Sequence, residues 1–392
     1  MTDEATSALS VADRRRGIVS AIASLTAVAM GLGASLPLLA LTLERQGISP
    51  FMIGLSSAFP AIGGLLITPF LPLLLRHFSA KHLLLGSVWI SAVCLISYYI
   101  VPNVWVWFPI RFVNGAVLVI LFVLSETTIN QLADDNTRGR LMGIYATVLA
   151  VGFATGPLVL VTAGSEGFLP YAIIAFLVAL ASIPISLAGP ATRQVSAHGQ
   201  SRGVLAFLLV APTATFAAFT FGALEQGTMT LMPVYGLRVG LTEQMAALVL
   251  TAFAAGNILS QIPLGLLADR LDRRLILVMC GLIGALTVAT LPLVQGTFLV
   301  MPVIFVFGGV TTGLYTVGLT LLGQRFRGGD LAAANAAFIM MYNFGGLAGP
   351  ALGGGAMELF PPHGLPLAFA AMTLLYGCIA GWRYAKLRSQ AS

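Results

Sequence analysis

Three charged side chains, Arg111, Glu126 and Glu225, lie well inside long apolar segments and are the first candidates for chemistry. Holding a charge in hydrocarbon costs roughly 3 kcal/mol even on lenient scales, so such residues usually face a cavity or a partner and mark a path. Partial removal from water disfavours the charged form of the Glu225 carboxyl, and an acid that binds and releases a proton reversibly can carry protons. The alternative is a glutamate that stays hydrogen-bonded to a neighbouring helix and serves structure alone.

Arg111 keeps its proton under ordinary conditions and would act as a fixed positive charge. It could stabilise a nearby ionised acid or bind an anionic substrate, or it could tie its helix to neighbouring carbonyl groups; both interpretations stay open. Glu126 lies on the same helical stripe, but about 22 Å of helix rise separates the two backbones, so they cannot pair. We expect Glu126 to meet Arg138 or Arg140, as a gate or structural contact rather than as a proton carrier.

Uncharged polar side chains in the same kind of apolar segment complete the candidate cavity. Thr311 and Tyr315 are four residues apart, and this spacing places them on one face of a helix. Polar side chains at helix contacts also hold helices together, so ordinary packing is the competing interpretation for each of them. The candidates are Gln226, Asn114, Thr311 and Tyr315, with Thr312, Asn257, Gln261, Tyr342 and Asn343 as further ones.

The sequence contains no residue pattern typical of a metal site or of an enzyme. All four histidines lie in or beside predicted loops, and no His-Glu spacing typical of a metal site occurs. No glycine-rich phosphate loop followed by Lys and Ser or Thr is present, so ATP is not expected as an energy source. An intramembrane enzyme would need a nucleophile and a base, or metal ligands, at one depth. The sequence therefore predicts no metal, no cofactor and no enzyme.

The elements that position these residues follow from composition. Of 392 residues, 58% are hydrophobic and only 9% are charged, whereas a soluble protein is about one quarter charged. So few charges could not cover a water-soluble surface, but a bilayer accepts an apolar exterior. This excludes a soluble enzyme, a nucleic-acid-binding protein and a secreted disulfide scaffold, and it predicts an all-α membrane protein. Twelve apolar runs are long enough to span a bilayer: 17–43, 51–75, 83–102, 105–130, 139–163, 168–189, 204–235, 244–267, 275–295, 298–323, 332–357 and 365–385.

The distribution of Lys and Arg predicts the orientation of these runs. Loops on one side carry 17 basic residues, and loops on the other side carry 2, Arg45 and Arg238. Because basic residues stay on the cytoplasmic side, both termini are expected in the cytoplasm. The pI of about 9.5 then reflects cytoplasmic loops rather than a surface that binds nucleic acid.

An internal repeat of 193 residues divides the chain. At this offset Arg45 aligns with Arg238, and Gly156-Pro157 aligns with Gly349-Pro350, without a gap. Each half holds an even number of spans, so the halves share one orientation, as in a parallel repeat. We expect two pseudo-symmetric six-helix bundles joined by a polar cytoplasmic linker. The predicted bundle, linker and bundle are 1–190, 191–203 and 204–392.

Three short motifs make the chain resemble the major facilitator superfamily of secondary transporters. The fourth run carries that family's R-x-x-x-G pattern, and the eleventh carries G-x-x-x-G-P-x-x-G-G. The loop after the eighth run is similar to the family's G-x-x-x-D-R-x-x-R loop, with its four matching residues at Gly265, Asp269, Arg270 and Arg273. Glu126 and the Arg138-Gly139-Arg140 sequence resemble a bacterial branch whose members mostly lack assigned substrates.

The resemblance implies a function as well as a fold. It implies a monomeric secondary transporter of a small organic solute, in the bacterial cytoplasmic membrane, that alternates access between its two bundles. In that family the first, fourth, seventh and tenth spans line the cavity, and Glu225 falls on the seventh. The partners expected are a small-molecule substrate, protons and the lipid bilayer, with no nucleic acid. The alternatives are an uncoupled facilitator, an uptake symporter, a lipid flippase and a membrane enzyme.

The resemblance also predicts an inner gate. In the family, the Asp of the loop motif caps a helix of the other half and helps to close the cytoplasmic side, so Asp269 is expected near Arg138 and Arg140. The matching position after the second run is Arg76, which cannot cap the positive end of a helix. Asp330 could supply the missing acid and form a polarity-swapped lock with Arg76.

The two Gly-Pro elements, Gly156-Pro157 and Gly349-Pro350, are expected to allow close helix approach and to bend their helices. In the resembled family a longer version of the element in the fifth span is associated with proton-driven export. Here Leu160 and Val161 replace two expected glycines, and the fuller version stands in the eleventh run. These departures weaken the inference to export, which is still modestly favoured over uptake.

Overall fold

The computed structural model describes residues 10–132, 138–188, 211–295, 297–326 and 328–389. All regular structure within these ranges is helical. The helices that precede residue 190 are α2 (Val11–Arg45), α3 (Pro50–Ile67), α4 (Leu71–His77), α5 (Ala80–Ile100), α6 (Val104–Leu132), α7 (Arg138–Thr155), α8 (Leu158–Ala163), α9 (Leu169–Leu180) and α10 (Ser182–Leu187). Those that follow are α12 (Pro212–Arg238), α13 (Glu243–Arg270), α14 (Arg273–Ala289), α15 (Val300–Arg325), α16 (Gly328–Leu359) and α17 (Gly364–Ser389).

Within the described residues, each predicted span is occupied by one helix or by consecutive helices; residues 204–210 of the seventh span lie outside the described part. Nine helical segments in the described part of the chain are long and apolar enough to cross a membrane. The other three predicted spans contain the broken pair α7 and α8, the helix α12 and the helix α16. The twelve-helix prediction is therefore confirmed.

Local sequence explains where several helices begin. The Ser79 side chain accepts from the backbone N–H of His82 at the start of α5, and Thr242 accepts from Met245 at the start of α13. Asp272 accepts from the N–H of Arg274 in the same way before α14. Each of these side chains satisfies a backbone donor that the first helical turn leaves unpaired.

The internal repeat is visible in the backbone after α2 and α12. Gly47 and Gly240, which are 193 residues apart, have φ of 71° and 88°, a region that glycine enters without steric cost. In both places the residue after the glycine donates its N–H five residues back, from Ile48 to Leu43 and from Leu241 to Gly236. The two helices thus end in the same glycine-dependent C-terminal cap.

Helix contacts repeat at the same offset. A Cβ on Gly63 would lie 2.0 Å from the carbonyl oxygen of Phe112, and a Cβ on Gly256 would lie 1.9 Å from that of Phe305. Glycine is therefore required for α3 to approach α6, and for α13 to approach α15, this closely. The repeat seen in the sequence corresponds to matching helix pairs.

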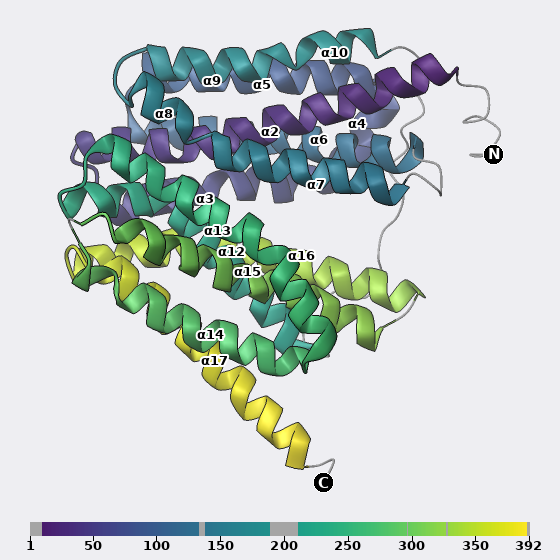
Figure 1. Cartoon of the computed structure of the whole chain (residues 1–392). Helices are drawn as coiled ribbons and strands as arrows, with labels where there is room; N and C mark the ends of the chain where they lie inside the picture. The colour runs from purple at the N-terminus through teal and green to yellow at the C-terminus, as the bar shows by residue number, and fades with distance from the viewer. Residues whose placement is uncertain (1–9, 133–137, 189–210, 296, 327, 390–392) are drawn as a thin grey trace. The chain divides into compact units, whose positions relative to one another are not determined.

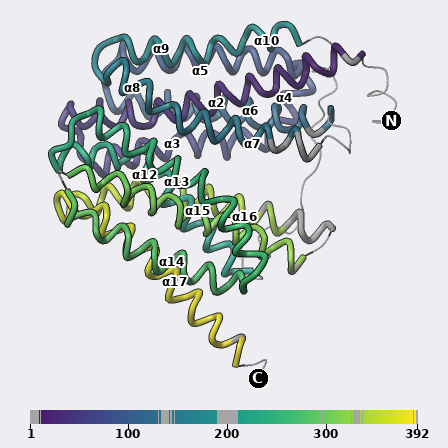
Figure 2. The backbone as a smooth tube through the Cα atoms, viewed as in Figure 1, coloured from purple at the N-terminus to yellow at the C-terminus, as the bar shows by residue number. Residues whose placement is uncertain are grey.

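The described contacts divide the chain into two compact units, residues 1–42 with 59–199, and residues 43–58 with 200–392. In the first unit α5 packs against α6 and α9, and α5 and α9 run side by side (Figure 1). In the second unit α12 packs against α16, α13 against α15, and α14 against α17, a pair that is easily followed in the tube view (Figure 2). The segment 43–58 therefore packs with the second unit, although it precedes the repeat boundary.

The two Gly-Pro elements differ in structure. The backbone leaves the helix at Gly156 and Pro157, which separate α7 from α8, whereas α16 continues through Pro350. Gly156 lies directly against Gly33 of α2, and Gly349 lies against the backbone of Ala223 in α12. Both glycines allow a close helix contact, but the helix is interrupted only at the first element.

Candidate functional site

Glu225 lies at the contact between α12 and α16. Its Oε2 accepts a hydrogen bond from the Tyr342 hydroxyl at 2.5 Å. The two helices approach closely here because Gly222 of α12 has no side chain; a Cβ at Gly222 would lie 2.1 Å from the carbonyl oxygen of Tyr342. The glutamate remains partly exposed. An acid predicted to lie in the membrane is thus held at a defined position between two helices.

Two further aromatic rings contact the tyrosine that donates to this acid. The ring centroids of Phe221 and Tyr315 are 5.5 Å apart, those of Tyr315 and Tyr342 are 5.8 Å apart, and those of Phe221 and Tyr342 are 6.1 Å apart. Glu225 with Phe221, Tyr315 and Tyr342 is called the Glu225 cluster below. Aromatic pairs at these separations stabilise one another, which favours a defined position for the Tyr342 ring.

The carboxylate of Glu225 has no cationic partner in the described structure. Among the residues that the structure describes, no Lys, Arg or His side chain forms an ion pair with it. The Tyr342 hydroxyl can donate to an ionised carboxylate or to the carbonyl oxygen of a protonated acid. The contact therefore accommodates both protonation states without moving a charged neighbour.

The other predicted cavity residues of the second unit divide into two groups. Tyr315 joins the Glu225 cluster, and Gln226 lies beside Glu225 with its Cγ 3.0 Å from where a Cβ on Gly346 would be. Thr311 is buried, and its hydroxyl donates to the carbonyl of Phe307 in the same helix. This hydrogen bond lies within α15, and a place for Thr311 in the cavity stays a prediction.

A separate polar contact links α13 and α15. The Thr312 hydroxyl donates to Oδ1 of Asn257 at 2.7 Å, and Gln261 donates to the same oxygen at 3.3 Å. These three residues connect two helices within the second unit, and none of their described hydrogen bonds involves Glu225. Their geometry is that of side chains that hold helices together.

Arg111 is buried in the first unit, with 1% of its surface exposed. Its Nε and Nη2 atoms have no hydrogen-bond partner among the described residues. Tyr98 of α5 and Tyr171 of α9 act on its charge electrostatically, so the side chain faces these helices. Asn114, one turn further along α6, accepts from Ser91 of α5 at 2.8 Å. Nε and Nη2 therefore do not tie α6 to neighbouring carbonyls, and the role of Arg111 stays a prediction.

The predicted gate residues are only partly described. Glu126 is partly buried in α6, and the structure gives it no ion pair with a described residue. Arg138 and Arg140 begin α7, and Asp330 lies in the first turn of α16, but their side chains lie outside the described part. Arg76 is exposed at the end of α4. The contact of Glu126 with α7 and the lock between Arg76 and Asp330 stay predictions.

The loop motif after α13 makes contacts inside its own unit. Asp269 is 73% exposed and lies 3.8 Å from Arg273. Arg273 also donates to the carbonyl oxygens of Ala268 and Thr320, and it thereby connects α13 to α15. Arg270 is exposed, and Gly265 has no atom within 4 Å of where its Cβ would be. The expected capping of α7 by Asp269 stays a prediction.

Four charged residues, at the ends of α2 and α12 and at the start of α13, form pairs that the sequence did not predict. Arg238 donates through Nε and Nη2 to the carboxylate of Glu44, at 2.7 and 3.0 Å, and Arg45 pairs with Glu243 at 2.5 Å. All four lie in the second unit, and they are called the helix-end ion pairs. The available signal was that the two arginines are repeat-related and lie on the side with few basic residues.

Comparison with known proteins identifies the family. The Major Facilitator Superfamily model matches residues 21–242 and again 214–391, so two overlapping matches cover nearly the whole chain. The chain belongs to the major facilitator superfamily. It is therefore a multi-pass membrane transporter, and the resemblance seen in the loop and span motifs is confirmed.

Relatives of this superfamily member support the same assignment. A Bacillus subtilis protein named as the uncharacterized MFS-type transporter YfkF is 27% identical over 92% of this chain and 95% of its own length. The Salmonella typhi protein named as the uncharacterized MFS-type transporter YcaD is 24% identical over 86% of this chain and 88% of its own.

Solved structures show the fold alone. The nucleoside transporter NupG has 16% sequence identity and a TM-score of 0.73, with 93% of this chain and 96% of NupG covered. A bacterial homologue of the human lysosomal transporter Spinster, in an inward-facing occupied conformation, has 13% identity and a TM-score of 0.76, with 96% and 97% covered. The all-helical superfamily fold predicted from the sequence is confirmed.

Proposed function

We propose that this transporter moves a small organic solute across the bacterial cytoplasmic membrane and couples that movement to protons through Glu225. The observation that carries the proposal is the hydrogen bond from Tyr342 to an acid that has no cationic partner among the described residues. The two halves predicted from the repeat, 1–190 and 204–392, would alternate access as one monomer with both termini in the cytoplasm. Export is the favoured direction.

The physical argument concerns the cost of changing the charge on Glu225. An acid paired with an arginine is stabilised in its ionised form, and protonating it strands a buried positive charge. Glu225 has only a neutral donor from Tyr342, so proton binding leaves no orphaned cation in the described surroundings. Its partial exposure gives the proton and a solute a route to the same side chain. These properties suit a reversible carrier better than a permanent structural contact.

The test uses purified protein in proteoliposomes with a pH-sensitive dye in the lumen. A panel of drugs, organic acids, sugars, amino acids and nucleosides is added to wild type, Glu225→Gln and the control Glu166→Gln. Glu166 is an exposed acid outside the described cavity candidates, so its variant controls for loss of one carboxylate. We expect at least one compound to move protons in wild type and in Glu166→Gln, but not in Glu225→Gln.

The same assay separates coupled transport from the main alternative. A radiolabelled form of the active compound is followed for accumulation against its gradient. Concentrative transport that persists in Glu225→Gln would remove Glu225 as the proton carrier. Transport that only equilibrates the compound, with no proton movement in wild type, would identify an uncoupled facilitator and leave Glu225 a structural role.

A further inference from the structure

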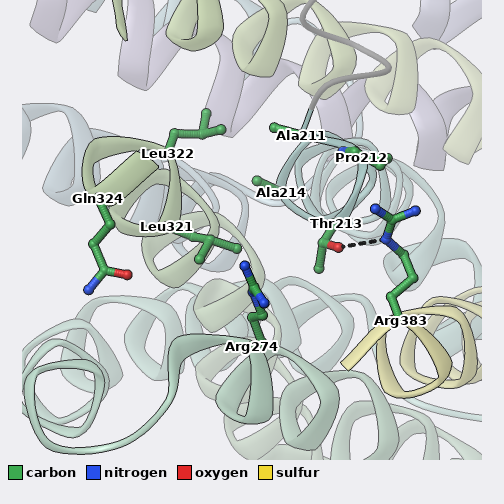
Figure 3. A pocket seen from close by; sticks show the side chains of 9 residues that line it. All are labelled: Ala211, Pro212, Thr213, Ala214, Arg274, Leu321, Leu322, Gln324 and Arg383. Atoms are coloured by element: carbon green, nitrogen blue, oxygen red, sulfur yellow. Dashed lines mark hydrogen bonds between the residues drawn. The ribbon is translucent and has the colours of Figure 1, made fainter. Parts of the chain in front are cut away.

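A cavity of about 290 Å³ lies at one end of the second unit (Figure 3), and no residue of the Glu225 cluster lines it. It is formed where α12 begins, where α14 begins, and near the ends of α15 and α17. Nine residues line it: Ala211, Pro212, Thr213, Ala214, Arg274, Leu321, Leu322, Gln324 and Arg383. All of them belong to one compact unit, so the cavity does not depend on how the two units are arranged.

The charge of this cavity is positive. Arg274 and Arg383 line it, and none of the lining residues is acidic. Arg383 donates through Nε to the Thr213 hydroxyl at 3.2 Å, which holds its guanidinium beside the start of α12. For the Arg274 guanidinium the structure gives no hydrogen bond or ion pair with a described residue. Asp272 accepts only from the backbone N–H of Arg274 and does not line the cavity.

The start of α12 adds one backbone donor to the same space. Ala211 is the N-cap of this 27-residue helix and provides no side-chain cap. Pro212 has no N–H, and the N–H of Ala214 donates to the carbonyl oxygen of Ala211, so Thr213 carries the one first-turn N–H for which the described structure gives no acceptor. The N-terminus of a long helix carries a partial positive charge that favours anions. The Thr213 hydroxyl and the Gln324 amide supply further polar groups. Two arginines and a helix start thus converge on one space.

The remaining lining is apolar. Leu321 and Leu322 of α15, with Ala211 and Ala214 at the start of α12, provide methyl and methylene surface rather than side-chain donors. A bare inorganic anion would use only the polar groups. A ligand with an anionic group and an attached apolar or glycerol-like portion would use both.

We propose that this cavity binds a phosphate ester, with the phosphate held by Arg274 and Arg383 at the start of α12. Paired arginines match phosphate oxygens through parallel N–H donors, and basic pockets between membrane helices bind anionic lipid headgroups on the cytoplasmic side. The charge distribution predicts that this end of the helices faces the cytoplasm. Two sources of the ester fit the chemistry, the headgroup of an anionic phospholipid or a soluble phosphate ester. This site is separate from Glu225 and does not rest on proton coupling.

The test measures the thermal unfolding midpoint of the detergent-purified full chain. The additives are phosphatidylglycerol, phosphatidylcholine as the zwitterionic comparison, and glycerol 3-phosphate as the soluble ester. The variants are Arg274→Gln, Arg383→Gln, their double variant, and Arg388→Gln as a control. Arg388 is an exposed arginine on α17 that does not line the cavity, so its variant removes one positive charge from the same helix.

We expect phosphatidylglycerol to raise the midpoint of wild type and Arg388→Gln more than phosphatidylcholine does. Each cavity arginine contributes about a fivefold increase in apparent affinity, so the double variant should bind about 25-fold more weakly. The proposal is overturned if the additives raise the midpoint of the double variant as much as that of wild type. It is also overturned if the two lipids raise the wild-type midpoint equally and glycerol 3-phosphate does not raise it. Protection by glycerol 3-phosphate that is lost in the double variant supports the site and assigns it to a soluble ester.

Arg383 also contacts Thr213, so its variant could lower stability without any ligand. Arg274→Gln avoids this difficulty because the Arg274 guanidinium has no described partner to lose. Native mass spectrometry of Arg274→Gln provides a second readout. A bound-lipid fraction unchanged from wild type would overturn the role of Arg274, and a reduced fraction with an unchanged unliganded midpoint supports it.

Discussion

The helix-end ion pairs allow a quantitative prediction about the segment 43–58. This segment packs with the second unit and is attached at its start by the pair between Glu44 and Arg238. It is also attached by the backbone N–H of Phe51, which donates to Glu358 at 3.1 Å. Replacing Glu44 or Arg238 with Gln removes one attachment and leaves the others, so local opening of the segment should become more frequent.

The expected size follows from the geometry of that pair. Arg238 binds both carboxylate oxygens of Glu44, which is the favourable bidentate form. The side chains are 28% and 16% exposed, so solvent screens part of the attraction. Exposed pairs contribute about 0.2–1 kcal/mol, and we take the upper end, about 1 kcal/mol, for this geometry. One kcal/mol corresponds to roughly a fivefold change in the local opening constant.

Hydrogen exchange followed by mass spectrometry measures this opening. Amides of 43–58 should exchange about fivefold faster in Glu44→Gln and in Arg238→Gln, and about fivefold faster in the double variant as well. The difference should shrink at high salt because ionic strength screens partly exposed charges. Glu166→Gln should leave exchange of this segment unchanged. Wild-type exchange in both single variants, or a 25-fold increase in the double variant, would refute the assigned pairing.

Three further predictions concern packing and buried polar groups. Gly256→Ala places a methyl group 1.9 Å from a backbone oxygen of α15 and should lower the free energy of unfolding by about 1–3 kcal/mol. Gly265→Ala on the same helix has no neighbouring atom within 4 Å of the added methyl group and should be neutral or slightly stabilising. Equal thermal unfolding midpoints for the two variants would contradict this packing. Tyr342→Phe removes the donor to Glu225 and should lower stability by about 1.5–3 kcal/mol. In the Glu225→Gln background the amide oxygen still accepts from Tyr342, so the same substitution should cost only about 0.5–1.5 kcal/mol; equal costs in a double-mutant cycle of unfolding midpoints would contradict a charge-assisted contact. Arg111→Met removes a buried guanidinium whose Nε and Nη2 atoms have no hydrogen-bond partner among the described residues, so the melting temperature should stay the same or rise while transport falls. A lower melting temperature would assign Arg111 a structural role.

Sequence alone determined the class of this protein because composition and periodicity are properties of each segment. A chain with 9% charged residues and twelve long apolar runs has few solutions other than a helical membrane protein. The repeat also fixed local geometry, since Gly47 and Gly240 occupy equivalent positive-φ caps. The motifs around Arg111 and Asp269 were enough to indicate the superfamily that the family model then matched.

Only the tertiary structure decided which side chains meet. Tyr342 is 117 residues from Glu225 in the sequence, and its hydroxyl reaches the carboxylate because glycine lets α12 and α16 approach closely. Phe221 was missed for the same reason, because its aromatic partners lie on other helices. The partners of Arg45 and Arg238 likewise depend on long-range packing that the repeat does not specify. Helical periodicity selects a face of each helix, but the neighbour of that face is set by how side chains of different helices fit together.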